Sequence, residues 1–308
     1  MKRGLTLWLA LVSVPGWAAS ECAEVVATRG GVQLKVGANH RLHFEVGDGQ
    51  GFLRRLAGRA LTASAKPFWL GAMSDVLEEV AGNSDPAPVF DKMLAALDIG
   101  YVTRGVPPTE IPASGALLLT AIHPRFGAEA LAIGALVSKI RPDLKVVMNE
   151  QTCIVPGFPE IAVGVHMTGC PEKKAQAYAE MRSWLKAGHA LLIFPAGGVS
   201  SYQPHTGNIE DHAWSRGVPL LARQTGAPIL PIHSDAAEPG FTFRMLSRLR
   251  SPAQKSTYPR EILRQRGQQI VLTLGAMVST EQLKNLGDSE EAAQFLRALT
   301  YGLGAFSE

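Results

Sequence analysis

The sequence predicts an α/β protein in which a mixed β-sheet is flanked by helices and preceded by a helical N-terminal region. Two observations carry this prediction. From about residue 115 onwards, short apolar runs of strand length alternate with longer runs of helical period. Gly and Pro residues stand at the ends of these runs and separate strand from helix.

Five segments are predicted to be strands because each is a short, mostly apolar run. They span residues 116–122, 145–148, 189–194, 227–232 and 269–274. Pro228 and Pro231 in the fourth segment lack an N–H for a ladder hydrogen bond, which favours an edge or bulged strand.

Helical periodicity and end signals predict the helices. The expected helical segments are 52–60, 90–97, 128–140, 171–187, 217–225, a short helix after 279 and 292–303. Gly100 is the predicted stop of the second segment. Ser279 with Gln282, and Asp288 with Glu291, predict capping boxes for the last two. Residues 23–48 alternate weakly and predict a short hairpin.

The first 20 residues have the three-part pattern of a signal peptide or a short N-terminal anchor. Lys2 and Arg3 precede the apolar run Leu5 to Val14, and small residues follow. We expect a membrane-associated protein, periplasmic if this segment is cleaved and otherwise at the inner membrane. The expected division of the chain is 1–20, a hairpin and helical region 21–100, and the main domain 101–308.

Composition excludes several function classes. The 308 residues are 46% hydrophobic and carry a net charge of +3, which is globular but too weakly basic to indicate nucleic-acid binding. The chain has no CxxC pair, P-loop, GxGxxG or GxSxG motif, so we expect neither a metal nor a bound cofactor. Pairing of Cys153 with Cys170, with Cys22 left over, stays open.

A candidate catalytic pair lies where the first long strand ends. His123 follows the apolar run that begins at Ala116, and Glu129 lies six positions later in the first turn of the next helix. Ligand sites of α/β sheets form at the carboxyl ends of strands. A carboxylate at a helix N-terminus can hydrogen-bond an imidazole and raise its basicity. The alternative is a histidine that only caps the strand end.

Three ordered segments share the pattern of a known family. They are Ile122-His123-Pro124 with Gly127 and Glu129, then Phe194 to Ser200 (FPAGGVS), then Gly226 to Pro231 (GAPILP), with Asp211 and Trp214 between the last two. In this order they resemble the glycerolipid (lysophospholipid) acyltransferase family, most closely its bacterial hemolysin-like branch. The resemblance runs from about Phe52 to Tyr301.

The resemblance implies transfer of a fatty acyl group to the hydroxyl of a lysophospholipid or other lipid acceptor. The acyl donor, a co-substrate, would be acyl-CoA, acyl-carrier protein or a phospholipid. His123 would be the general base and Glu129 would orient it. The implied acceptor-binding residues are Phe194, Pro195, Gly197, Gly198 and Ser200.

The sequence departs from the family pattern at three places. Ile122 replaces Asn, Gly198 replaces Glu, and no Arg stands near Val165 and His166. These departures leave two alternatives open, namely a lipid-binding protein that has kept the fold but lost the reaction, and a lipid hydrolase that uses water as acceptor.

A basic segment near the C-terminal third predicts contact with a membrane surface. It carries Arg244, Arg248, Arg250, Lys255 and Arg260, interleaved with apolar residues. Such segments bind lipid phosphates at anionic bilayers. A solvated basic loop is the alternative.

Overall fold

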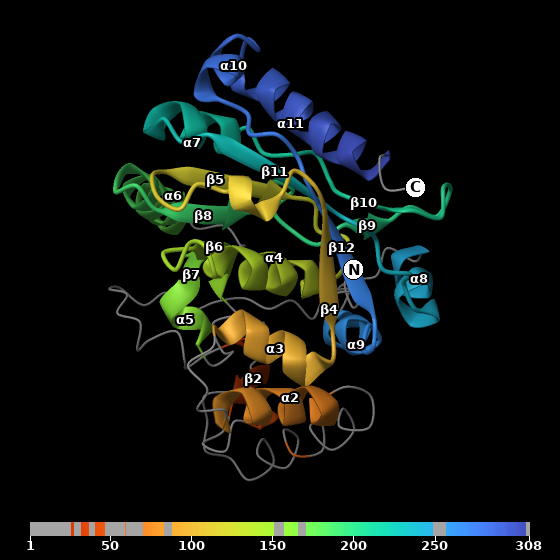
Figure 1. Cartoon of the computed structure of the whole chain (residues 1–308). Coiled ribbons are helices and arrows are strands. Elements are labelled where there is room, and N and C mark those ends of the chain that lie inside the picture. Colours follow the sequence, from red (N-terminus) through yellow and green to blue (C-terminus); the bar gives the residue numbers. More distant parts are fainter. Residues whose placement is uncertain are drawn as a thin grey trace, which may run out of the picture.

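The computed structural model describes residues 26–27, 32–36, 41–46, 59, 70–82, 88–150, 157–165, 171–248 and 257–305. A seven-stranded sheet forms its centre (Figure 1). In spatial order the strands are β4 (Gly100–Gly105), β12 (Gln269–Leu274), β11 (Ile229–Ser234), β5 (Leu117–Ala121), β8 (Ala190–Ile193), β6 (Lys145–Asn149) and β7 (Ala162–Val165). The sheet is mixed, because β11 and β12 pair antiparallel and all other neighbours pair parallel.

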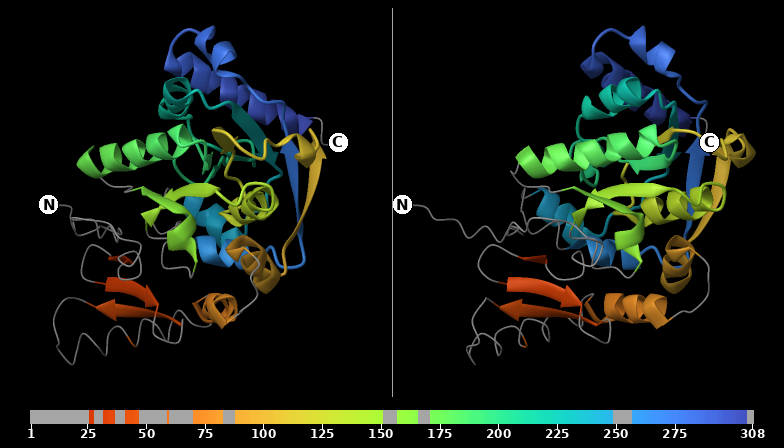
Figure 2. Two further views of the ribbon diagram at one scale, coloured as in Figure 1. Left: turned by 60° about the vertical axis from the view of Figure 1, so that its left-hand side comes forward. Right: turned by 90° about the vertical axis from the view of Figure 1, so that its left-hand side faces the viewer.

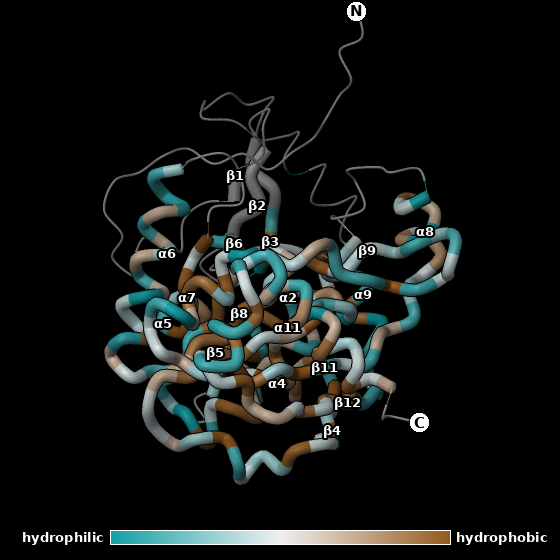
Figure 3. Tube along the Cα trace, turned by 90° about the horizontal axis from the view of Figure 1, so that it is seen from above, coloured by the Kyte–Doolittle hydropathy of each residue, from teal (hydrophilic) through white to brown (hydrophobic). Residues whose placement is uncertain are grey.

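Helices cover both faces of this sheet, because successive apolar side chains of β5 point to opposite faces and both sets are buried. Leu117 and Leu119 of β5 face one core, whereas Leu118 faces the other. The helices on the first face are α2 (Gly71–Gly82), α3 (Val89–Leu97) and α4 (Ala128–Ser138). Those on the second are α6 (Pro171–Lys186), α7 (Gly217–Thr225), α10 (Thr280–Lys284) and α11 (Ser289–Gly304). Figure 3 shows the most apolar parts of the trace gathered on the central strands. The predicted α/β class with a flanked mixed sheet is confirmed.

The smaller elements connect or extend these layers. They are η3 (Pro108–Glu110), α5 (Phe158–Ile161), β9 (Ser201–Tyr202), β10 (Ile209–Glu210), α8 (Phe241–Arg248) and α9 (Tyr258–Leu263). β9 and β10 form a separate antiparallel pair. Among the described residues, no helix combines the length and the apolar character needed to cross a bilayer.

The sequence predicts the fourth strand, 227–232, at an edge of the sheet or at a bulge, and the edge position is wrong. β11 lies between β12 and β5. Its ladder with β12 begins only at Ile232, opposite Leu274, and the next contact in the other direction is the bridge from Ile229 to Val278. Pro231 lies between them, and its carbonyl accepts the N–H of Gly275 at 2.9 Å. No donor is needed from its nitrogen there, so a proline is tolerated inside the sheet.

The predicted stop of the second helix is also wrong by two residues. α3 ends at Leu97 and is capped by Asp98, which adopts a left-handed conformation with φ 52° and whose N–H donates to Ala95 O. Gly100 instead begins β4. An aspartate tolerates this conformation better than most residues, so glycine is not required at the cap.

An antiparallel three-stranded sheet precedes α2 (Figure 2). It consists of β1 (Val26–Ala27), β2 (Val32–Val36) and β3 (Leu42–Val46). The N–H of Leu42 donates to Ser74 Oγ of α2 at 3.0 Å, and Arg41 pairs with Glu78 at 2.8 Å. The predicted signal segment 1–20, most of the predicted helix 52–60, His166 and all three cysteines lie outside the described residues.

Candidate active site

The two segments singled out in the sequence leave the sheet side by side. β5 and β8 are parallel neighbours, with Thr120 opposite Ile193, so their carboxyl ends coincide. His123 lies two residues beyond β5, and Phe194 follows β8 directly. The two rings stack with centroids 4.2 Å apart at 22°. The N–H of Ser200 donates to His123 O at 2.9 Å, so the turn 194–200 is attached to His123 at both ends.

Glu129 contacts the imidazole of His123, as the spacing predicts. It is the second residue of α4, and its carboxylate is completely buried. One oxygen, Oε1, bonds His123 Nδ1, and the other accepts the N–H of Gly127 at 3.1 Å. Gly127 has φ 115°, a conformation that favours glycine, and it forms the N-cap of α4. The positive end of the helix dipole further favours a carboxylate here.

This contact fixes which nitrogen of His123 is basic. A carboxylate only accepts hydrogen bonds, so the neutral ring carries its proton on Nδ1 and its lone pair on Nε2. No residue in the described part of the chain bonds Nε2, and the side chain is 16% exposed. Burial disfavours the imidazolium, but the charge and hydrogen bond of Glu129, with the charge of Asp211, outweigh it and raise the pKa of His123 above 6.5.

Asp211 is a second buried carboxylate at the site, and the sequence pointed to it only through its spacing to Trp214. Its Oδ1 accepts the N–H of His123 at 3.1 Å and also the hydroxyl of Ser200. Its Oδ2 accepts Trp214 Nε1–H at 2.9 Å. The backbone of Asp211 is held in turn, because its N–H donates to Tyr301 OH at 2.8 Å. Asp211 therefore joins β5, the turn 194–200 and α11.

The turn from Phe194 to Ser200 presents open backbone at its middle. The N–H of Gly197, a residue with φ 69°, donates to Phe194 O at 3.0 Å and closes the turn. A Cβ added at Gly197 or Gly198 would meet no atom within 4 Å. The N–H groups of Gly198 and Val199 donate to no residue that the structure describes. Such groups are available to an anion.

Other residues of this turn are used internally. Ser200 is buried, and its hydroxyl is engaged with Asp211. Pro195 is buried, and its carbonyl accepts the N–H of Ser215 at 2.9 Å. The predicted acceptor residues thus divide into an open pair, Gly197 and Gly198, and residues that hold the turn in place.

The loop between His123 and Glu129 is anchored to the C-terminal part of the chain. Arg125 is 4% exposed; its Nε donates to Asp235 Oδ1 at 2.9 Å, and its Nη1 donates to Gln265 Oε1 at 3.1 Å. Phe126 has φ 62° and packs edge-on against Phe243 of α8, with centroids 4.9 Å apart. These contacts attach the loop 123–129 to residues far away in the sequence.

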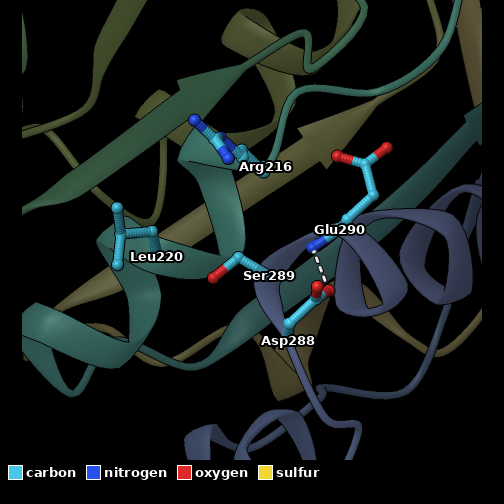
Figure 4. A pocket seen from close by; sticks show the side chains of 5 residues that line it. All are labelled: Arg216, Leu220, Asp288, Ser289 and Glu290. Atoms are coloured by element: carbon cyan, nitrogen blue, oxygen red, sulfur yellow. Dashed lines mark hydrogen bonds between the residues drawn. The ribbon is translucent and has the colours of Figure 1, made fainter.

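A separate surface pocket of about 290 Å³ lies between α7 and α11 (Figure 4). It is lined by Arg216, Leu220, Asp288, Ser289 and Glu290. The Asp288 carboxylate accepts the N–H groups of Glu290 and Glu291, so two donors at the start of α11 are already used and a negative charge lies beside them. Within the described ranges, no three His, Cys, Asp or Glu side chains are grouped to hold a metal ion. The candidate site is therefore the His123 cluster.

Comparisons with known proteins identify no family for this chain. No protein-family model matches it, and no curated protein is significantly similar in sequence. Among solved structures it is similar to the 1-acyl-sn-glycerophosphate (LPA) acyltransferase PlsC from Thermotoga maritima, with 15% identity and a TM-score of 0.45 over 80% of this chain and 92% of that one. A likeness of this size does not identify the reaction, which has to be inferred from the residues around His123.

Proposed function

We propose that the protein is an O-acyltransferase that acts on the hydroxyl of a lysophospholipid or another lipid alcohol. One observation carries this proposal: His123 has Nδ1 fixed by Glu129, and neither its Nε2 nor two backbone N–H groups of the adjacent turn bond any of the described residues. A base with a fixed tautomer is suited to take a hydroxyl proton. Unpaired N–H groups beside it suit the phosphate of a lysolipid.

The proposed reaction has one proton donor and one leaving group. The acceptor hydroxyl gives its proton to His123 Nε2 while its oxygen bonds the acyl carbonyl carbon of the donor. The tetrahedral intermediate then collapses, and the imidazolium returns the proton to the departing thiolate or alkoxide. Glu129 stabilises the imidazolium throughout, because its charge lies at Nδ1. The donor is a co-substrate such as acyl-CoA, acyl-carrier protein or a phospholipid.

The proposed acceptor site is the turn after β8. The N–H groups of Gly198 and Val199 would bind the phosphate, and the space at Gly197 and Gly198 would admit the headgroup. Phe194 keeps the imidazole in place by stacking on it. Ser200 keeps the turn against His123, and Pro195 attaches it to Ser215, through the bonds described above.

The proposed place of action is a membrane surface. Arg244, Arg248 and Arg260 belong to α8 and α9, whereas Arg250 and Lys255 lie outside the described residues. Clustered arginines favour an anionic leaflet. Periplasmic or inner-membrane location depends on the fate of residues 1–20.

A second candidate function is lipid binding without reaction. The specific observation that favours it is the space at Gly198, where the turn offers backbone donors but no side-chain acceptor for the acceptor hydroxyl. Anion binding by N–H groups does not need a side chain at this position.

The two candidates are separated by a His123→Ala variant of the full chain, assayed with a lysophospholipid and several acyl donors by lipid mass spectrometry. We expect turnover to fall by ~10²–10⁴-fold, as for loss of a general base, with lysolipid binding retained. The matched control is His189→Ala, since His189 also bonds a carboxylate, Asp143, at 3.2 Å but precedes β8 at the opposite end of the sheet. Unchanged turnover in His123→Ala overturns the assignment. A parent protein that binds lysolipid without turnover supports the binding function.

A further inference from the structure

Helix α8 has two faces with different surroundings. Phe243 is completely buried on the inner face. Phe241 and Met245 are 77% and 42% exposed, and Phe241 is the most exposed large apolar side chain of the described residues. Phe241, Met245 and Arg248 follow one another at i, i+4 and i+7, so they form one outward stripe. Phe241 and Met245 together form an exposed apolar patch beside basic side chains, and such a patch is typical of an interaction site.

The charge around this stripe is strongly one-sided. Residues 241–266 contain seven basic residues and one acidic residue, Glu261, a net charge of +6. The whole chain carries +3, so the remaining residues together carry −3. Glu261 is buried, accepts the N–H of Gly240 at 2.8 Å and pairs with Arg264 at 3.6 Å. The exposed Glu238 just before this segment pairs with Arg244 at 3.6 Å, and the net charge from 238 to 266 is still +5. This asymmetry points the α8 side of the protein towards a negatively charged surface.

Helix α8 contacts both loops of the candidate site, Phe243 from its buried face and Arg248 from its last turn. Phe243 packs on Phe126, which lies between His123 and Glu129. The guanidinium of Arg248 lies 6.0 Å from the ring centroid of Tyr202, two residues after Ser200. Figures 1 and 3 show α8 at the periphery of the molecule, beside β9 and α9. A surface bound by the outer face of α8 would therefore be close to the candidate site.

We propose that α8 docks the protein on an anionic lipid bilayer, with Phe241 and Met245 inserted among the headgroups and the arginines on lipid phosphates. A bilayer interface accepts apolar and cationic side chains from one helix face, because arginine stems extend along apolar surface while their charges reach phosphate. A protein partner would need about 800 Å² of complementary surface, more than one two-turn stripe offers. The proposal concerns binding and does not depend on acyl transfer, so vesicle binding tests it separately from turnover.

The test is co-sedimentation of the full chain with vesicles of phosphatidylglycerol and phosphatidylcholine in equal parts, and with vesicles of phosphatidylcholine alone. We expect binding to the anionic vesicles that falls with added salt. Phe241→Ser with Met245→Ser should lower the partition coefficient by about tenfold or more, since burying such a side chain completely is worth more than one factor of ten. Arg244→Glu with Arg248→Glu should lower it on the order of 30-fold or more.

Matched variants show whether the effect belongs to α8. Phe295→Ser on α11 removes another exposed phenylalanine, and Lys174→Glu with Arg182→Glu makes the same charge change on exposed positions of α6. Both controls should bind like the parent protein. Hydrogen exchange on bound protein should show protection of 241–248 only with anionic vesicles.

Three outcomes overturn the proposal. One is parental vesicle binding in both α8 variants. Another is hydrogen exchange of the α8 amides that is as fast in the vesicle-bound protein as in the free protein. The third is concentration-dependent self-association that Phe241→Ser with Met245→Ser abolishes while vesicle binding persists, which would assign the stripe to a second copy of the chain.

Discussion

The substitution Glu129→Gln tests the most specific feature of the site, because one amide cannot make both bonds of the carboxylate. Glu129 accepts from His123 Nδ1 and from the N–H of Gly127. A glutamine has one acceptor oxygen and one NH₂ donor. The Gly127 N–H is a fixed donor, whereas the imidazole can change tautomer. The amide oxygen will therefore face Gly127, and the NH₂ will donate to Nδ1. The ring proton then moves to Nε2, which loses its lone pair.

The expected loss of turnover follows from this tautomer change. Loss of general-base catalysis costs ~10²–10⁴-fold, and replacing the aspartate of a serine-protease triad by asparagine costs about 10⁴-fold for the same reason. The residual activity should also change its pH dependence. In the parent protein the rate should rise with pH through a His123 pKa above 6.5. Without the charge of Glu129, burial dominates, so this limb should move to lower pH.

The assay combines turnover with a direct measurement of the tautomer. Rates are measured across pH with a lysophospholipid acceptor, and ¹⁵N chemical shifts of the imidazole report which nitrogen carries the proton. Glu160→Gln on α5 is the control, because it makes the same chemical change outside the cluster. Parental turnover in Glu129→Gln, with the ring still protonated on Nδ1, would refute the assigned roles of both residues.

Three further predictions concern the same cluster. Asp211→Asn should lower the free energy of unfolding by about 1–3 kcal/mol, measured by urea titration, because its NH₂ would face the Trp214 N–H without an acceptor; unchanged stability would contradict this. The stability that His123 gains from its raised pKa should be complete below pH 6.5 and be lost as pH rises through the folded pKa. In urea titrations, the difference in the free energy of unfolding between the parent protein and Glu129→Gln should therefore shrink above pH 6.5. A pH-independent difference would contradict this. Gly198→Glu, for which the structure has room, should raise turnover if the missing carboxylate limits acceptor positioning; a slower variant would indicate a different acceptor.

Elements that depend on residues close together in the chain could be predicted from the sequence. The apolar run before His123 is β5, and the capping box at Ser279 forms both of its expected bonds with Gln282. The spacing of His123 and Glu129 led to the observed contact, because a tight turn into a helix limits where the sixth residue can lie. Both contacts span only a few residues, so chain geometry alone restricts them.

Elements fixed by distant contacts were not predictable in this way. β4 carries Thr103 and Arg104 and lacks a continuous apolar run, because it is an edge strand paired only with β12. Asp211 acquires its position from Tyr301, Trp214 and Ser200 together. The packing of Phe126 on Phe243 joins residues more than a hundred positions apart. No local pattern specifies such pairs, since they follow from the tertiary arrangement.

The departures at Ile122 and Gly198 have different consequences in the structure. Ile122 is 3% exposed and packs in the core beneath α6, α7 and α11, so its side chain takes no part in the cluster. The backbone N–H of His123 donates to Asp211 Oδ1 and does not involve the side chain of residue 122. Gly198, in contrast, leaves open space where the acceptor is proposed to bind. His123 and Glu129 thus meet without a contact from the side chain of residue 122, and under the proposed function any weakness in transfer should originate in how the turn 194–200 holds the acceptor.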